Sequence, residues 1–275
     1  MKERILVAVI FVPLLFVVLF FLPPFVLAGV IVIVCSISAY ELVYAIGVKE
    51  NVRITIYAVV SAAIIPVGVC FGFGELVFTA VFIVLLCLLF FEAIMAFKTD
   101  RQISFAKILT TLFGGALIPY LLSSLVSLKN MHEGHLYVLL PVISAFVTDA
   151  GAYFTGMFIG KHKAFPHISP KKTIEGYIGG LIIGTVAMML YGSILANTTL
   201  YEIRFWALAI YGIIGAVFTE LGDLAFSLIK REFDIKDYGQ LLPGHGGMLD
   251  RFDSMIFAAP AIYLLVSVFP AMIVD

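Results

Sequence analysis

The chain has 275 residues, of which 62% are hydrophobic and only 13% are charged, and its formal net charge is −1. A soluble globular domain has about half apolar and a quarter charged residues. This surplus of apolar side chains therefore cannot be buried in one water-soluble core. The balanced charge gives no sign of a nucleic-acid partner. The composition predicts an integral membrane protein.

Nine apolar segments are long enough to cross a membrane as helices, since a span needs about 20 mostly apolar residues. They cover residues 5–22, 25–47, 54–72, 76–97, 103–128, 136–160, 176–196, 204–230 and 252–273. The first run is longer than the apolar part of a signal peptide and lacks a small-residue cleavage site nearby, so we expect a retained helix. No segment predicts a strand pair, and lipid does not tolerate open sheet edges. The predicted fold class is an all-α polytopic membrane protein of about nine transmembrane helices.

Basic residues predict the orientation of these helices. If the N-terminus is cytoplasmic and nine helices alternate, all but two of the 17 Lys and Arg residues lie in cytoplasmic segments, and only Lys129 and Arg204 lie outside. Such asymmetry follows the positive-inside rule, and an eight-helix count would destroy it. We expect a multi-pass protein of the cytoplasmic membrane with its C-terminus outside and its two long polar connections, 161–175 and 231–251, in the cytoplasm.

The polar residues also suggest two regions. Residues 1–130 hold about five transmembrane helices that we expect to act as a scaffold, with lipid access as a further role. Residues 131–275 are expected to form the catalytic region. In the seventh span, glycines at 176, 180 and 184 make a small-residue face that favours close helix packing. This face could pack within one chain or between two copies, so a homodimer stays open.

Carboxylates inside the later spans mark a candidate site. Asp149 lies in the sixth span among aromatic residues. Four polar residues share one face of the eighth span: Glu220, Asp223, Ser227 and Lys230. Carboxylates within a membrane are costly and usually face a cavity, a partner or an ion. Glu41 and Glu92 also lie in spans, but each is near a predicted cytoplasmic end, so we expect them to be interfacial or packing residues.

The second polar connection carries the most informative pattern. Glycines at 244, 246 and 247 surround His245 and lead into the ninth span. Successive amides in such a loop can bind an anion, and a helix N-terminus favours phosphate. Asp250 and Asp253 follow, one helical turn apart, with Arg251 between them. Helix capping explains one aspartate, whereas a pair beside a phosphate-binding loop suits Mg²⁺, which takes one or two carboxylates.

The first polar connection is basic. It contains Lys161, Lys163, Lys171 and Lys172, with no acid before Glu175. A general attraction to anionic lipid explains the first two lysines as well as a binding site would. The second two directly precede a helix, which favours a phosphate-binding role. At the end of the eighth span, Lys230 and Arg231 could equally be a membrane-edge anchor or part of a site.

The stretch from Ser227 to Asp253 resembles the signature of the phosphatidate cytidylyltransferases, also called CDP-diacylglycerol synthases. The matching positions are Ser227, Lys230-Arg231, Lys236-Asp237, the Pro-Gly-His-Gly-Gly run at 243–247 and Asp250-Arg251-Phe252-Asp253. Segments 149–156 and 169–176 also resemble that family, while residues 1–130 match only in being hydrophobic helices. Many members carry an acid just before the serine, where this chain has Phe226.

The resemblance implies an enzyme that makes CDP-diacylglycerol and pyrophosphate from CTP and phosphatidic acid at the cytoplasmic face. Asp223, Asp250 and Asp253 would hold Mg²⁺, and a second metal or a monovalent cation stays open. His245 would assist the departing pyrophosphate, and Asp149 would line the site. Lipid and nucleotide phosphates would contact Lys171, Lys172, Lys230, Arg231 and Arg251. Further substrate-binding positions would be Ser227, Lys236, Gly244, Gly246 and Gly247.

Two other classes of protein remain as alternatives. A different Mg²⁺-dependent membrane transferase, moving a phosphosugar or another phospho group onto a lipid phosphate, would also use intramembrane aspartates, but its usual motifs are not visible. An ion-coupled transporter could use Asp149, Glu220 and Asp223 as an ion path. Transporters often show two similar halves, whereas here the charges concentrate in the C-terminal half.

Overall fold

The structure is a computed structural model that describes residues 13–45, 47, 51–99, 102–241 and 246–273. In this part of the chain, eight helical segments are long and apolar enough to cross a membrane. They are Pro24–Ala45, Val52–Cys70, Gly74–Met95, Phe105–Asn130, Gly134–Ile159, Ile174–Thr198, Phe205–Glu232 and Leu249–Val268. Each coincides with a predicted span, which confirms an all-α polytopic membrane protein. The remaining predicted span, 5–22, lies partly outside the described residues, and its residues 13–20 are helical.

The chain forms two compact units. One contains residues 1–132 and 232–252, and the other contains residues 133–231 and 253–275. The first boundary falls close to the one that the sequence suggests, but the polar segment 232–252 groups with the N-terminal helices. The scaffold and catalytic roles that we assign to residues 1–130 and 131–275 remain predictions.

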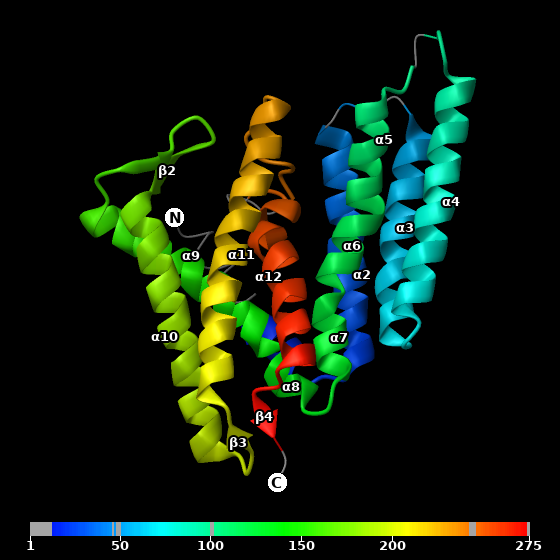
Figure 1. Cartoon of the computed structure of the whole chain (residues 1–275). Helices are drawn as coiled ribbons and strands as arrows, with labels where there is room; N and C mark the ends of the chain where they lie inside the picture. Colours follow the sequence, from blue (N-terminus) through cyan, green and yellow to red (C-terminus); the bar gives the residue numbers. More distant parts are fainter. Residues whose placement is uncertain (1–12, 46, 48–50, 100–101, 242–245, 274–275) are drawn as a thin grey trace. The chain divides into compact units, whose positions relative to one another are not determined.

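The first unit is built from long helices and one interrupted span (Figure 1). Its helices are α2 (Pro24–Ala45), α3 (Val52–Cys70), α4 (Gly74–Met95), α5 (Phe105–Leu112), the π-helix η1 (Phe113–Leu117), α6 (Ile118–Leu122) and α7 (Ser124–Asn130). α2 packs on α3, and α3 packs on α4. A Cβ atom added at Gly114 in η1 would lie 2.8 Å from the side chain of Leu42. Glycine thus lets the π-helical turn approach α2 closely.

The second unit contains the remaining elements (Figure 1). They are α8 (Gly134–Tyr137), α9 (Leu139–Ile159), β1 (Lys163–Phe165), β2 (Ser169–Thr173), α10 (Ile174–Thr198), β3 (Glu202–Ile203), α11 (Phe205–Glu232), α12 (Leu249–Val268, which begins in the first unit) and β4 (Met272–Ile273). The predicted glycine face of α10 packs on α9. A Cβ atom at Gly176 would lie 2.8 Å from the carbonyl oxygen of Ala152, and one at Gly180 would lie 3.0 Å from that of Thr148. The face is therefore used within one chain.

Two short strand pairs correct the expectation that the chain has none. β1 and β2 form an antiparallel hairpin in which Lys163 faces Thr173. β3 pairs with β4, so that Glu202 faces Ile273 and Ile203 faces Met272. These strands are too short to show the alternating pattern that identifies a strand in sequence. They lie outside the candidate spans, so the membrane-spanning part is helical throughout the described residues.

Candidate active site

A cavity of about 420 Å³ lies in the second unit. Its lining residues come from α9, strand β2, α10 and α11. The ionisable ones are Asp149, Tyr153, Lys171, Lys172, Tyr177, Glu220 and Asp223. The structure thus brings together two predicted lysines and two predicted aspartates from three separate elements, β2, α9 and α11.

An ion pair crosses this cavity from strand to helix. The Lys172 amine of β2 contacts the Asp223 carboxylate of α11, and each side chain is about one-quarter exposed. Burial, the largest single influence, lowers the pKa of Lys172, but Asp223, Tyr177 and Asp149 together raise it by more, so its pKa lies above the usual value. Lys172 also lies 5.3 Å from the centre of the Tyr177 ring. The cavity therefore contains a cation that stays protonated at neutral pH.

Two further aspartates are close to this pair. Asp253 of α12 is 9% exposed, and the charges of Asp223, Lys230 and Asp149 act on it. Its Oδ1 accepts the N–H of Ser254 at 2.8 Å, and the Ser254 hydroxyl donates to Asp149 Oδ2 at 3.0 Å. Ser227, one turn after Asp223, donates to Asp223 Oδ1 at 3.4 Å. Three aspartates from three helices are thus gathered in one unit.

The chemistry of these aspartates fits Mg²⁺. Carboxylate oxygens are its preferred protein ligands, and it commonly uses only one or two of them while water and substrate phosphates complete the octahedron. Among the described residues, no group of three or more His, Cys, Asp or Glu side chains is arranged to hold a metal ion by itself. Asp223 and Asp253 therefore suit a site that substrate phosphates would complete.

Glu220 is a cavity residue that sequence reasoning did not select for the reaction. Its Oε1 is buried and has no hydrogen-bond partner among the described residues. Glycine at position 180 makes room for it, since a Cβ atom there would lie 2.8 Å from that oxygen. The sequence signal for Glu220 is its place on the same helical face as Asp223, from which we expect only a cavity-facing carboxylate or, in a transporter, part of an ion path.

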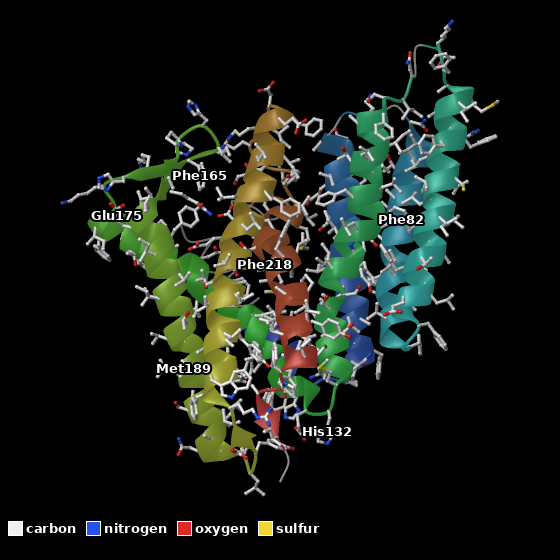
Figure 2. All side chains as sticks on the ribbon, viewed as in Figure 1. Phe82, His132, Phe165, Glu175, Met189 and Phe218 are labelled. Atoms are coloured by element: carbon white, nitrogen blue, oxygen red, sulfur yellow. The ribbon has the colours of Figure 1, made fainter. Side chains whose placement is uncertain are left out.

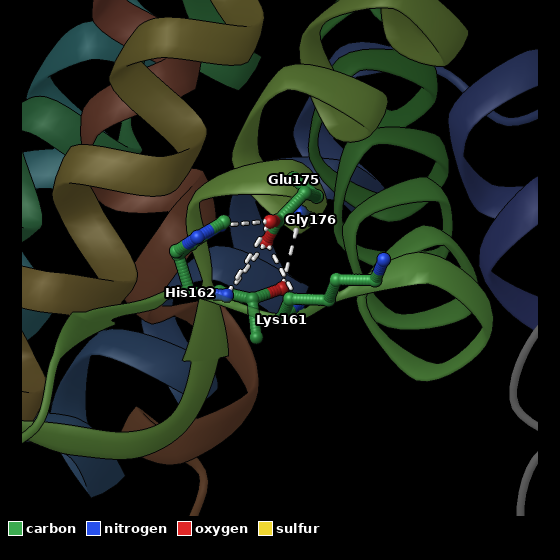
Figure 3. A network of polar contacts seen from close by, with 5 residues as sticks. Lys161, His162, Glu175 and Gly176 are labelled. Carbon is green, nitrogen blue, oxygen red and sulfur yellow. Dashed lines mark hydrogen bonds and ion pairs between the residues drawn. The ribbon is translucent and has the colours of Figure 1, made fainter.

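The β1–β2 hairpin is fastened at its base by Glu175. The carboxylate accepts the backbone N–H groups of Lys161 and His162 at 3.1 and 3.2 Å, and it lies 2.6 Å from His162 Nδ1 (Figure 3). The hairpin also packs on α10, because Phe165 of β1, which Figure 2 labels, contacts Tyr177 of α10 edge to face with ring centres 6.0 Å apart. These contacts fix the strand that carries Lys171 and Lys172.

The other end of the hairpin meets α11. The Arg231 Nε–H donates to the carbonyl oxygen of Ile168 at 3.2 Å. The last turn of α11 is therefore joined to the hairpin turn, and Lys230 and Arg231 lie on the same side of the unit as the basic strand. This contact gives Arg231 a structural role in addition to the phosphate contact that we expect.

The predicted glycine loop belongs to the first unit, where residues 246 and 247 are described and Pro243, Gly244 and His245 lie outside the described residues. Gly246 has φ of +82°, a conformation that favours glycine. The Asp250 carboxylate is 7% exposed, and its Oδ2 accepts the N–H groups of Tyr238 at 2.9 Å and Gly247 at 3.0 Å. Asp250 thus braces the loop.

Glu41 of α2 takes the next two amides. Its carboxylate oxygens accept the N–H groups of Met248 and Leu249, each at 2.9 Å. Carboxylates of the protein thus accept the N–H groups of Gly247, Met248 and Leu249. The substrate contacts expected at Gly244, Gly246 and Gly247 remain predictions, and the Gly247 N–H already has a protein acceptor. Glu92, by contrast, is a packing residue as expected, bonded to Tyr57 at 3.1 Å and Arg53 at 3.5 Å.

Sequence comparison assigns the chain to a family. Residues 2–269 match the cytidylyltransferase family. The chain belongs to this family. Among its curated relatives is a phosphatidate cytidylyltransferase of Bacillus subtilis, 36% identical over 191 residues, which are 69% of this chain and 68% of that protein.

Staphylococcal members of the family are more similar over a shorter stretch. The phosphatidate cytidylyltransferase of Staphylococcus saprophyticus is 44% identical over 140 residues, and that of Staphylococcus aureus (strain COL) is 43% identical over the same length. These matches cover 50% of this chain and 51% of each relative. The chain thus spans about half the length of these staphylococcal relatives.

One family position has a structural explanation in this chain. Phe226, at the position where the resemblance leads us to expect an acid, is fully buried and contacts Phe257 of α12 edge to face, with ring centres 6.3 Å apart. The Phe226 side chain therefore packs between α11 and α12. Asp223, one turn earlier, is the acid of this helix that faces the cavity and Lys172.

Proposed function

We propose that this protein is a phosphatidate cytidylyltransferase, which converts CTP and phosphatidic acid to CDP-diacylglycerol and pyrophosphate. The observation that carries the proposal is the Lys172–Asp223 pair in a cavity bounded by membrane-spanning helices and a basic hairpin. Family membership and the activity for which the relatives are named support it. The reaction needs a place where a soluble triphosphate meets a lipid phosphate, and such a cavity provides one.

The chemistry requires no protein nucleophile. An oxygen of the lipid phosphate forms a bond to the α-phosphorus of CTP, and the bond from that phosphorus to the bridging oxygen of the β-phosphate breaks. Pyrophosphate leaves with the electron pair. Catalysis then consists of positioning and charge neutralisation. Lys172 is suited to this because it can exchange one oxyanion partner, the Asp223 carboxylate, for another, a substrate phosphate.

The remaining cations would share the binding of phosphates. Lys171 lines the same cavity as Lys172, and Lys230, Arg231 and Arg251 are the other candidates. The proposed role of His245, assistance to the departing pyrophosphate, rests on the sequence alone. Asp149 would orient the site through the hydroxyl of Ser254.

Asp223 and Asp253 would hold Mg²⁺, with Asp250 as a further candidate on the basis of its spacing from Asp253. The ion would neutralise negative charge on the triphosphate and activate the α-phosphorus as a Lewis acid. A second metal or a monovalent cation is compatible with this donor set.

The orientation that we propose places the cavity at the cytoplasmic face, where CTP is available. It rests on the distribution of basic residues and the positive-inside rule. The polar connection 161–175 with its four lysines and the basic end of α11 then lie at the cytoplasmic surface of the membrane. The N-terminus would be cytoplasmic and the C-terminus outside.

Labelled nucleotides test the proposal. The purified protein in detergent is supplied with phosphatidate, Mg²⁺ and CTP labelled at either the α- or the γ-phosphorus. We expect the α-label in the lipid product and the γ-label in pyrophosphate, in equal amounts. A lipid that carries the γ-label, or no product at all, would overturn the proposal. Turnover that persists in excess chelator would refute the role of the metal ion but not the transferase activity.

A further inference from the structure

Glu41 connects the N-terminal helices to the loop that carries the family resemblance. It lies near the end of α2 and is only 5% exposed. Its two oxygens accept the N–H groups of Met248 and Leu249, which are more than 200 positions away in the chain. Leu249 is the first residue of α12. A side chain from the second predicted span thus caps the helix that carries both Asp250 and Asp253.

The loop is shaped around this carboxylate. The backbone at Gly239 and Gly247 approaches Glu41 from two sides, and a Cβ atom at Gly247 would lie 2.5 Å from Glu41 Oε2. A Cβ atom at Gly239 would collide with Oε1. Glycine is therefore needed at both positions because the carboxylate fills the space between them.

Asp250 holds the same loop from within. Its Oδ2 accepts the N–H of Gly247, directly before the two amides that Glu41 takes, and also that of Tyr238. Three successive amides, at residues 247, 248 and 249, therefore point to two buried carboxylates. Loss of Glu41 would leave two of these donors without their acceptor and the first turn of α12 without its cap.

We propose that Glu41 is a positioning residue for the transferase reaction: it fixes the loop of residues 246–249 and the first turn of α12, and thereby the placement of Asp250 and Asp253. The inference rests on the proposed function. It assigns a role in the reaction to the N-terminal region, which the sequence predicts only as a scaffold. Glu41 does not touch substrate in this proposal; it acts through the helix that it caps.

Glu41→Gln tests the proposal. The amide retains one acceptor oxygen but presents an NH₂ group to the second backbone N–H, so one bond is replaced by a clash of donors. We expect kcat to fall by about 100-fold, because a small misplacement of reacting groups can cost that much. The KM for CTP should change much less, by no more than about two-fold, because Lys171 and Lys172, two of the proposed phosphate contacts, are on β2 and not on the capped helix. Hydrogen exchange at residues 247–250 should accelerate, with protection elsewhere retained.

Glu92→Gln is the matched control. Glu92 is also a buried glutamate of the first unit, 9% exposed, but it binds the side chains of Arg53 and Tyr57. It should leave kcat and exchange at residues 247–250 unchanged. Glu41→Asp, which withdraws the carboxylate by one methylene, provides a milder variant should the glutamine form not fold, and we expect the same changes to a smaller extent.

The outcomes separate this inference from the proposed function. An inactive wild-type protein would refute the transferase activity, but the exchange measurement would still test the cap. An active Glu41→Gln protein with unchanged kcat would overturn the positioning role. Exchange that accelerates equally throughout the first unit would also overturn the positioning role, because Glu41 would then serve general stability. A rise in the KM for CTP with constant kcat would overturn it as well.

Discussion

Both compact units place carboxylates inside membrane-spanning helices, but the partners differ. In the second unit, Asp223 faces the Lys172 amine at a cavity. In the first unit, Glu41 and Asp250 accept backbone N–H groups. A backbone amide cannot leave its place without unfolding its segment, whereas a lysine side chain can rotate to another anion. The Asp223–Lys172 pair therefore suits a site where a substrate replaces one partner. The bonds of Glu41 and Asp250 to backbone amides suit a fixed frame.

The energetic consequence follows from the cost of buried charge. A carboxylate away from water needs charge-assisted hydrogen bonds or a counter-ion, and each hydrogen bond to a charged group contributes about 1.5–3 kcal/mol. Glu41 uses two such bonds to fix a loop. Asp223 is paired with Lys172, whose amine could bind a substrate phosphate in place of the Asp223 carboxylate. The two units thus use similar side chains for structure and for chemistry.

The largest effect is expected from Asp223→Asn. The substitution removes the counter-ion of Lys172 and a proposed metal ligand, so the rate of pyrophosphate release should fall by about 1,000-fold. The matched change in the first unit is Glu92→Gln, which removes the carboxylate that pairs with Arg53, and it should leave the rate unchanged. Equal losses in both variants would mean that the distinction between the units is wrong.

Two substitutions of Asp250 can separate its role in bracing the loop from a role in the reaction. Both amides bind the same oxygen, Oδ2, so Asp250→Asn can keep both bonds while it loses the charge. If Asp250 is a metal ligand, the asparagine variant should lose about 100-fold in rate with normal hydrogen exchange in the loop. Asp250→Ala should lose the rate and the protection together. Nearly full activity in the asparagine variant would make Asp250 a loop brace only.

The glycine face of α10 gives a smaller effect on stability. A Cβ atom at Gly180 would lie 2.8 Å from Glu220 Oε1 and 3.0 Å from Ala152 Cβ, and overpacking of this kind costs about 1–3 kcal/mol. Gly180→Ala should therefore lower the midpoint of thermal unfolding in detergent. Gly29→Ala in α2 is the control, because nothing lies within 4 Å of the added atom. A Gly180→Ala protein as stable as this control would show that α9 and α10 are less tightly packed.

The sequence predicts the spans well because each is one long apolar run, and its local spacing identifies the acids and lysines that meet in the cavity. It does not predict Glu41 as the cap of α12, since that contact joins segments more than 200 residues apart. A glutamate near a helix end carries no signal that says which backbone it will meet. The hairpin was missed for the opposite reason: its strands are three and five residues long, too short for a pattern.

The smallest effect is expected at the base of the hairpin. Glu175→Gln removes the charge that joins His162 to the first turn of α10, while the amide oxygen can still accept one backbone N–H. Because the side chain of His162 is exposed, such a pair contributes little to stability. The strand that carries Lys171 and Lys172 should become slightly looser, so the KM for CTP should rise about two-fold with kcat unchanged. Glu202→Gln, in the other strand pair, should leave both constants as they are, and a fall in kcat for Glu175→Gln would mean that the hairpin positions the reacting groups and not only the nucleotide.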